Sequence, residues 1–144
     1  MDYKDEFYHT LDKTNEIALA TAVAGLPNVR IVNFCYDASK PGILYFATDR
    51  ENQKVAEFAQ NNNVAFTTVP SDGSSVPHAR SNHAVVHKSR YTIDEIKELF
   101  IQKIPGYDET LAAIGDTLDV FEIHIKDVFV IVDYETAGPV SFEV

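Results

Sequence analysis

The sequence predicts a mainly β domain with flanking helices, closed or nearly closed into a barrel. About seven short segments rich in Val, Ile, Phe and Tyr are bounded by turn residues, and three helical segments lie among them. So many short strands in 144 residues fit a barrel better than a flat sheet. Apolar residues do not alternate cleanly along the strands, as Ile31, Val32 and Phe34 show. Both sheet faces should therefore be covered, one by the barrel core and the other by helices or the second subunit of a homodimer.

The chain is expected to form one domain over residues 1–144, located in the cytoplasm. Its single cysteine, Cys35, has apolar neighbours and no base nearby in sequence, so we expect a core thiol in a reducing compartment. The start, Met1–Glu6, is acidic where a signal peptide would be basic and apolar, and no apolar run approaches the ~18 residues of a membrane span. A net charge of −10 argues against nucleic acid or an anionic membrane as partner.

The first half of the chain is predicted to contain a helix over Asp5–Thr14 and a buried strand over Glu16–Gly25. Two further strands, Val29–Tyr36 and Ile43–Thr48, are expected to pair as a hairpin through the turn residues of Asp37–Gly42. If Tyr36 pairs with Ile43, this register sets Arg30 opposite Asp49.

A second helix should follow the hairpin. Thr48 and Glu51 form a T-x-x-E pattern, which predicts a capping box, and Asn61-Asn62-Asn63 should end the helix.

The second half should hold four more strands and one helix. Two strands are expected at Val64–Val69 and Ala79–Ser89. Thr92 and Glu95 predict a capping box for a helix that Pro105-Gly106 stops. The remaining pair of strands is predicted as a hairpin of Asp119–Ile125 and Val128–Tyr134 around Lys126-Asp127.

Arg30 stands alone among apolar residues, and a buried guanidinium is costly unless an anion accompanies it. The anion could be a phosphate or the side chain of Asp49. A helix N-terminus with Arg30 and Lys54 nearby would suit a phosphate, because unpaired N–H groups and positive charge converge there. The segment 30–90 carries seven basic and five acidic residues, a net +2, which leaves −12 on the rest of the chain.

Three short motifs carry a resemblance to a known family. They are P-N-V-R-I-V-N with Arg30, L-Y-F-A-T with Thr48, and R-E-N-Q-K with Lys54. Their order and spacing resemble the FMN-binding split β-barrel family typified by pyridoxamine 5'-phosphate oxidase. The resemblance implies a Greek-key-type split barrel of about six to seven strands, dimeric, with FMN at the subunit interface. It also implies that Arg30, Thr48 and Lys54 hold the FMN phosphate, and it favours phosphate over Asp49 as the partner of Arg30.

The same resemblance implies further contacts to the cofactor. The flavin ring would lie along the strand after Arg30 and near Ala47, and the phosphate loop would include Asn52 and Gln53. Gln53 departs from the oxidase, which has an Arg there, so one charged contact is lost. The partner subunit would close the site through the segment that holds Arg80, Ser81 and His83. The full set of cofactor-binding residues expected is Arg30, Ile31, Val32, Asn33, Ala47, Thr48, Asn52, Gln53, Lys54, Arg80 and His83.

The implied function is that of an FMN-dependent oxidoreductase acting on an unknown small molecule, with NAD(P)H as a candidate electron donor. Pyridoxamine 5'-phosphate oxidase activity itself is disfavoured, because the tail G-P-V-S-F-E-V lacks that enzyme's Trp-, Arg- and His-bearing segment. The tail is more similar to the small flavoproteins of the nitroimidazole-resistance-like branch. Alternatives on the same fold are a non-catalytic flavin or haem carrier or sensor, with His83 or His87 as axial ligand, and a deazaflavin protein. The catalytic residues stay unassigned.

A metal site is not expected. His78, His83 and His87 are close in sequence, but in a strand His83 and His87 would lie ~13 Å apart, too far to share one ion. As a helix, the segment would still lack the carboxylate or Cys that a zinc site usually adds.

Overall fold

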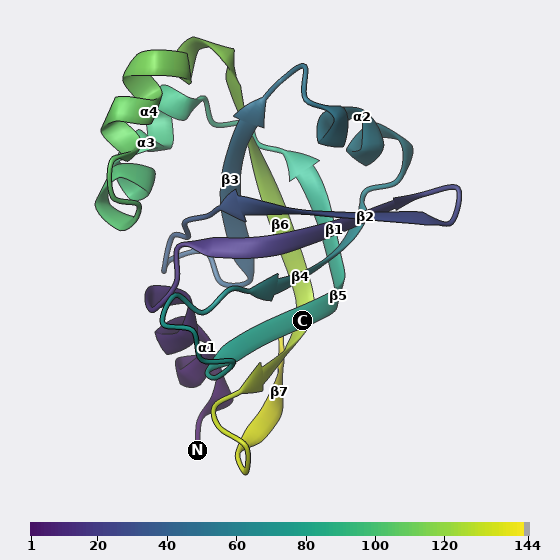
Figure 1. Cartoon of the computed structure of the whole chain (residues 1–144), viewed down its shortest axis with the longest axis vertical. Coiled ribbons are helices and arrows are strands. Elements are labelled where there is room, and N and C mark those ends of the chain that lie inside the picture. The colour runs from purple at the N-terminus through teal and green to yellow at the C-terminus, as the bar shows by residue number, and fades with distance from the viewer. Residues whose placement is uncertain (143–144) are drawn as a thin grey trace.

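A computed structural model describes residues 1–142 and shows a seven-stranded antiparallel sheet curled into a split barrel, with helices on its outside (Figure 1). The strands are β1 (Glu16–Val23), β2 (Leu26–Asn33), β3 (Ile43–Asp49), β4 (Asn63–Thr68), β5 (His78–Lys88), β6 (Leu118–Ile131) and β7 (Ala137–Ser141). The helices are α1 (Tyr3–Asp12), α2 (Gln53–Gln60), α3 (Ile93–Lys103) and α4 (Tyr107–Ile114), followed by the 3₁₀ turn η1 (Gly115–Thr117). This architecture confirms the predicted mainly β split barrel with flanking helices.

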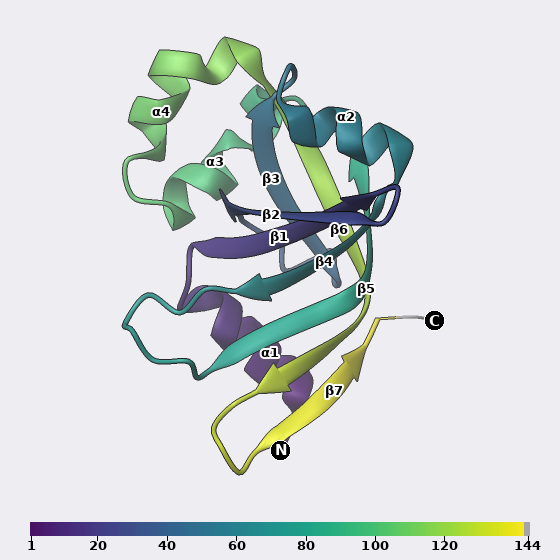
Figure 2. The same cartoon turned by 45° about the vertical axis from the view of Figure 1, so that its right-hand side comes forward.

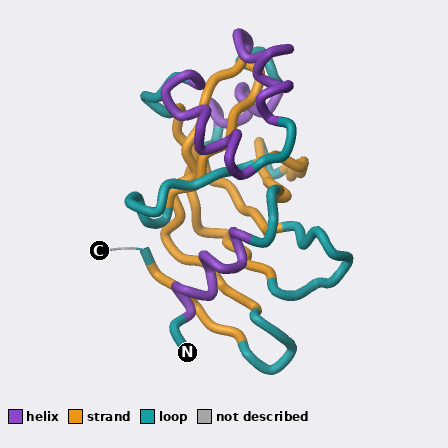
Figure 3. The backbone as a smooth tube through the Cα atoms, turned by 90° about the vertical axis from the view of Figure 1, so that its left-hand side faces the viewer, coloured by secondary structure: helices purple, strands orange, loops and turns teal. Residues whose placement is uncertain are grey.

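The strand order is β2-β1-β4-β5-β6-β3, and β7 pairs with β6 beyond the barrel. The two ends of this path, β2 and β3, are linked near their junction by one bridge, Cys35 with Tyr45. The barrel is therefore split between β2 and β3. Figures 1 and 2 show α2 at the same end of the molecule as the α3–α4 pair. Figure 3 shows α1 at the opposite end, where it packs on β7.

The predicted hairpin between the second and third strands is wrong. Residues 26–33 fold back on β1 through a two-residue turn at Ala24 and Gly25, whose φ angles are 52° and 78°. Positive φ at both central residues is typical of the type I′ turn that matches the twist of a β-hairpin. Arg30 consequently lies opposite Leu19 rather than Asp49.

The C-terminal region also differs from the prediction. Residues 118–131 form one long strand, β6, which passes through Lys126 and Asp127 without turning. The turn lies later, between β6 and β7, where Val132 N–H donates to the carbonyl of Thr136 at 2.9 Å. The helix α4 was not predicted. It begins directly after Gly106, a residue with a φ of 77°. The capping box of α3 is confirmed, with Thr92 and Glu95 bonding to each other's backbone N–H groups.

Two apolar clusters hold the domain together. The barrel core collects inward-facing residues of the strands with α1 and α2, among them Phe7, Ile17, Leu44, Phe46, Phe58 and Ile123. The second cluster lies where α3 and α4 cover the outer face of β3 and β6, and contains Cys35, Tyr45, Ile96, Phe100, Ile104, Tyr107 and Val120. Cys35 is thus the core thiol that was expected, and burial raises its pKa far above the usual value.

The outer face of β2, which was expected to be covered by helices or by a second subunit, is open in the single chain. Val29 and Ile31 point outward and are 64% and 52% exposed, and Leu26 at the strand's start is also exposed. Arg30 and Val32 share the inward face, because their antiparallel partners Leu19 and Ile17 are core residues. No helix within residues 1–142 is long and apolar enough to cross a membrane.

Candidate functional site

Arg30 lies on the inward face of β2, at the end of the barrel beside α2. Its guanidinium donates one hydrogen bond to Thr21 Oγ1 at 2.8 Å and another to Glu57 Oε1 at 2.5 Å. Thr21 Oγ1 also donates to the same Glu57 oxygen at 3.3 Å. The Arg30 side chain is only 19% exposed. The carboxylate beside Arg30 is therefore Glu57 of α2 and not Asp49, because β3 pairs with β6 and carries Asp49 away from β2.

Lys54 reaches back from the first turn of α2 to the end of β3. Its ammonium donates to Thr48 Oγ1 at 2.7 Å, and both residues are buried. The predicted Thr48–Glu51 capping box is wrong, because Thr48 still belongs to β3 and the helix begins four residues later than that pattern implies. Asn52 is the N-cap, and its side-chain oxygen accepts the Lys54 backbone N–H at 3.0 Å.

The buried ammonium of Lys54 has no carboxylate of its own. In the described chain, Lys54 forms no ion pair with an acidic side chain. Burial lowers the pKa of Lys54, and repulsion by Arg30 lowers it further, while Asp49 and Glu57 oppose that shift. The Arg30, Lys54 and Glu57 side chains together carry a net charge of +1.

This donor set fits a phosphate. The Lys54 ammonium has three N–H donors and uses one for Thr48, and a guanidinium has five donors, of which two are bonded here. The N-terminus of the eight-residue α2 adds positive potential beside Lys54. Glu57 opposes such an anion, because it already accepts from Arg30 and its carboxylate would repel a phosphate, and the Asp49 carboxylate adds to this repulsion at Lys54.

Sequence reasoning missed both Thr21 and Glu57 as members of this cluster. A signal existed for each. Thr21 is the polar residue within the apolar run I-A-L-A-T-A-V, and it faces the barrel interior. Glu57 is three residues after Lys54, a spacing that places two side chains on one face of a helix.

The remaining predicted cofactor contacts are spread over both faces of the sheet. Ile31 and Asn33 are on the exposed outer face of β2, whereas Val32 points into the barrel core. Ala47 packs against the α3–α4 cluster. Gln53 is the exposed first residue of α2.

Arg80 and His83 do not join the Arg30–Lys54 cluster within one chain. Arg80 lies over the ring of Phe129, 5.6 Å from its centroid, and His83 Nδ1 lies 2.7 Å from Asp127 Oδ2. Arg80 lines a shallow groove of about 490 Å³ on the outer face of the sheet, and Val29 of β2 lines the same groove. The groove has a floor of small side chains, namely Ala18, Ala20, Ala65 and Thr67.

The three clustered histidines have separate surroundings. His78 Nδ1 lies 2.6 Å from the Ser75 carbonyl oxygen, His83 pairs with Asp127, and His87 packs against His124. Across residues 1–142, no group of three His, Cys, Asp or Glu side chains is arranged to hold a metal ion.

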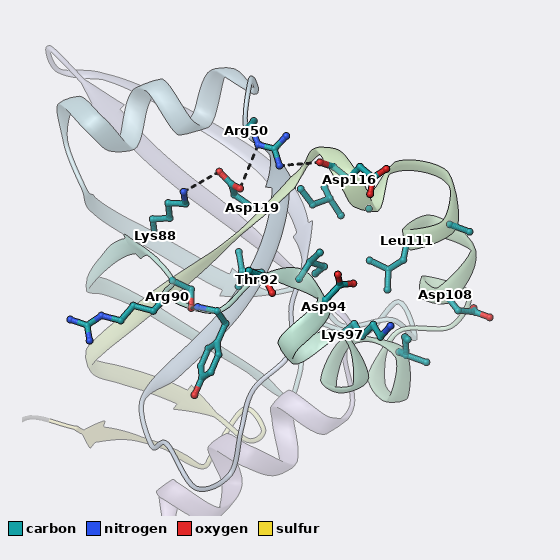
Figure 4. A pocket seen from close by; sticks show the side chains of 18 residues that line it. Arg50, Lys88, Arg90, Thr92, Asp94, Lys97, Asp108, Leu111, Asp116 and Asp119 are labelled. Carbon is teal, nitrogen blue, oxygen red and sulfur yellow. Dashed lines mark hydrogen bonds and ion pairs between the residues drawn. The ribbon is translucent and has the colours of Figure 1, made fainter.

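A larger cavity of about 640 Å³ lies between the α3–α4 pair and the ends of β5 and β6 (Figure 4). Two of its cations, Arg50 and Lys88, already share one carboxylate. Figure 4 shows Asp119 between Arg50 and Lys88, with Arg50 Nε at 3.6 Å and Lys88 Nζ at 3.5 Å, and Arg50 also donates to the Asp116 carbonyl at 3.0 Å. This cavity is a weaker candidate for a cofactor phosphate than the Arg30–Lys54 cluster.

The sequence matches a family described as pyridoxamine 5'-phosphate oxidase-like over residues 10–136. No curated protein is similar enough in sequence to match it.

Solved structures share the fold at low sequence identity. A heme binding protein from Mycobacterium smegmatis superposes with a TM-score of 0.72 at 15% identity, covering 98% of this chain and 58% of that one. This chain thus spans less than two thirds of that protein. A putative pyridoxamine 5'-phosphate oxidase from Listeria innocua gives 0.71 at 17% identity, covering 92% and 100%. An FAD-binding protein from Mesorhizobium loti gives 0.65 at 15% identity, covering 96% and 93%.

Proposed function

Because this chain belongs to the pyridoxamine 5'-phosphate oxidase-like family, we propose that it binds FMN and acts as a flavin-dependent oxidoreductase on a small molecule. The observation that carries the proposal is the buried ammonium of Lys54, which has Thr48 but no carboxylate as its partner. A phosphate is the anion that would neutralise it. The FAD-binding protein of the same fold supports a flavin as the cofactor.

In this proposal Arg30, Thr48 and Lys54 bind the phosphate, and Asn52 fixes the start of α2 beside it. The flavin ring lies along the backbone of Ile31, Val32 and Asn33, where N–H and C=O groups can bond to its polar edge. Bound FMN supplies the electron-transfer chemistry, and the protein supplies binding, orientation and exclusion of water.

A second subunit completes the proposed site. The exposed apolar residues Val29 and Ile31 on β2, and the groove beside them, form a surface that a second copy of the chain would cover. That copy would bring Arg80 and His83 towards the flavin. The assembly is then a homodimer with two equivalent sites, as expected for an isologous interface.

The test is the visible spectrum of the purified protein, followed by titration of cofactor-stripped protein with FMN. We expect a flavin spectrum and saturable FMN binding, which Lys54→Met weakens about tenfold or more, equivalent to ~1.4 kcal/mol or more. Lys13→Met, at an exposed lysine of the α1 C-cap, is the matched control and should bind FMN as the wild type does. A protein that takes up haem with a Soret band instead, or that binds FMN equally well without Lys54, would refute the proposal.

A further inference from the structure

A second basic pocket lies on the outer face of β5 and β6, away from the Arg30–Lys54 cluster. Its volume is about 460 Å³. The β5–β6 register sets His87 opposite Glu122, and Glu122 and His124 alternate with the core residue Ile123. These polar side chains therefore project outward, on the opposite face of the sheet from the barrel core. The volume falls in the range of small-molecule sites, about 300–1,000 Å³.

The pocket is lined by two imidazole rings and by a carboxylate that already has hydrogen-bond partners. The His87 and His124 ring centroids lie 5.2 Å apart, edge to face at 78°. Glu122 Oε1 lies 2.8 Å from His124 Nε2, and Glu122 Oε2 accepts from Ser89 Oγ at 2.7 Å. Both carboxylate oxygens of Glu122 thus have hydrogen-bond partners.

The rim carries Lys40, Lys88 and Arg90. Lys40 comes from the segment between β2 and β3, donates to the Tyr91 hydroxyl, and lies 4.4 Å from the centroid of that ring. Lys88 is paired with Asp119 at 3.5 Å. Within the part of the chain that the structure describes, neither Lys40 nor Arg90 forms an ion pair with a carboxylate.

Such a gathering of cations is notable in a chain of net charge −10. Lys40 and Arg90 are in no ion pair, although the Asp37 carboxylate acts on Lys40 from nearby, and two imidazoles line the same pocket. An anion placed between them would relieve their mutual repulsion and accept hydrogen bonds from ammonium, guanidinium and imidazole donors.

We propose that this pocket binds a phosphate-bearing small molecule at a site separate from the FMN site. A phosphate matches the donors better than a single carboxylate, because its three terminal oxygens offer more acceptors to the Lys40, Arg90 and histidine donors that line the pocket. The proposal does not depend on the presence of FMN.

The probe is phenyl phosphate, titrated into ¹⁵N-labelled protein in the presence of a metal chelator. The Lys54→Met variant serves as the background, because it weakens the Arg30–Lys54 cluster as a competing anion site. We expect saturable shifts of the His87 and His124 ring signals, with affinity about tenfold weaker in Lys40→Ala and in Arg90→Ala. Lys126→Ala, at an exposed lysine of β6 outside the pocket, is the control that should leave binding unchanged.

Failure of this proposal is distinguishable from failure of the FMN proposal. Absence of saturable shifts at the two rings, or shifts unaffected by Lys40→Ala and Arg90→Ala, would overturn it while leaving FMN binding untouched. Equal affinity for benzoate would overturn the assignment of a phosphate, and binding that requires added Zn²⁺ would show a metal site instead. Inorganic phosphate, tested in the same way, shows whether the phosphate group alone suffices or the aromatic part contributes.

Discussion

Arg30 and Glu57 form an ion pair between β2 and α2, with 2.5 Å between the guanidinium nitrogen and the carboxylate oxygen. The pair ties the edge strand of the barrel to the helix that carries Lys54. It also places a carboxylate within the cluster that we propose to hold a phosphate. Glu57 therefore both stabilises Arg30 and opposes an anion, and these two effects can be measured separately.

Replacing Glu57 by Gln should strengthen FMN binding. The amide keeps the size of the side chain but removes the negative charge, so the local net charge rises from +1 to +2. We expect a severalfold lower Kd, measured by flavin fluorescence titration, together with a lower Tm of the cofactor-free protein. Glu51→Gln, at an exposed residue of the turn before α2, is the control and should change neither value appreciably. Weaker FMN binding in Glu57→Gln would contradict the placement of the phosphate.

Replacing Arg30 by Met should destabilise the cofactor-free fold. The change leaves the buried Glu57 carboxylate without its cation. We expect the free energy of unfolding to fall by about 2 kcal/mol. This loss is smaller than for a fully buried ion pair, because both side chains keep some exposure. Urea denaturation gives the measurement. The double variant Arg30→Met/Glu57→Leu should recover part of the loss, since it removes the orphaned charge; a double variant less stable than Arg30→Met alone would argue against an ion-pair origin.

FMN affinity should fall at alkaline pH as Lys54 loses its proton. Its pKa is lowered in the folded protein, so the neutral form appears below the ordinary value of 10.5. At pH values between the lowered pKa of Lys54 in the folded protein and its pKa in the unfolded chain, the unfolded chain binds more protons at this residue. The contribution of Lys54 to the free energy of unfolding therefore rises with pH in that range. The attraction of Lys54 for a phosphate falls over the same range, because the ammonium loses its charge. Lys103 has a lowered pKa too. The comparison with Lys54→Met isolates the relevant group, and that variant should lose the alkaline decline in affinity.

Replacing Ile31 by Lys should convert the proposed dimer to a monomer. The residue is 52% exposed on the outer face of β2, so the change costs little in one chain but places a charge in an apolar interface. Sedimentation velocity should show half the wild-type mass, and FMN binding should weaken with it. Tyr134→Lys, at an exposed residue beyond the end of β6, serves as the control. An unchanged mass in Ile31→Lys would rule this face out as the interface.

Gly42→Ala should destabilise the protein through two separable effects. Gly42 has a φ of 78°, and an added Cβ would lie 2.9 Å from Cγ of Phe142. Gly73 has a similar φ of 81° but nothing within 4 Å, so Gly73→Ala reports the backbone strain alone. We expect Gly42→Ala to lose about 1–3 kcal/mol by urea denaturation, and more than Gly73→Ala. Equal losses would mean that Phe142 moves aside freely.

Local signals allowed much of the fold to be predicted from the sequence. The capping box of Thr92 and Glu95 is a short-range pattern, and it is confirmed in the structure. The pairing of β2 was predicted wrongly, because the turn residues of 37–42 are more conspicuous than the Ala24-Gly25 pair that forms the hairpin. The long β6 was split in the prediction, since Lys126-Asp127 looks like a turn but lies within the strand.

The candidate site was predictable only in part. Arg30, Thr48 and Lys54 were predicted as site residues from motif order, and the structure places Thr48 and Lys54 in direct contact. The partners of Arg30 were not found, because Thr21 and Glu57 come from other elements and approach it only once β2 folds onto β1. The sequence contains each side chain, but their proximity depends on a strand pairing that no local pattern specifies.

The exposed edge of β2 affects how the protein behaves during purification and storage. β2 ends the strand order on one side, so it presents unpaired backbone groups together with the apolar side chains of Val29 and Ile31. A strand of this kind is a template on which further chains can add in register. Without a cofactor or a second subunit to cover it, the chain should be prone to aggregate from this edge. Yield and storage life should then rise with occupancy of the proposed flavin site.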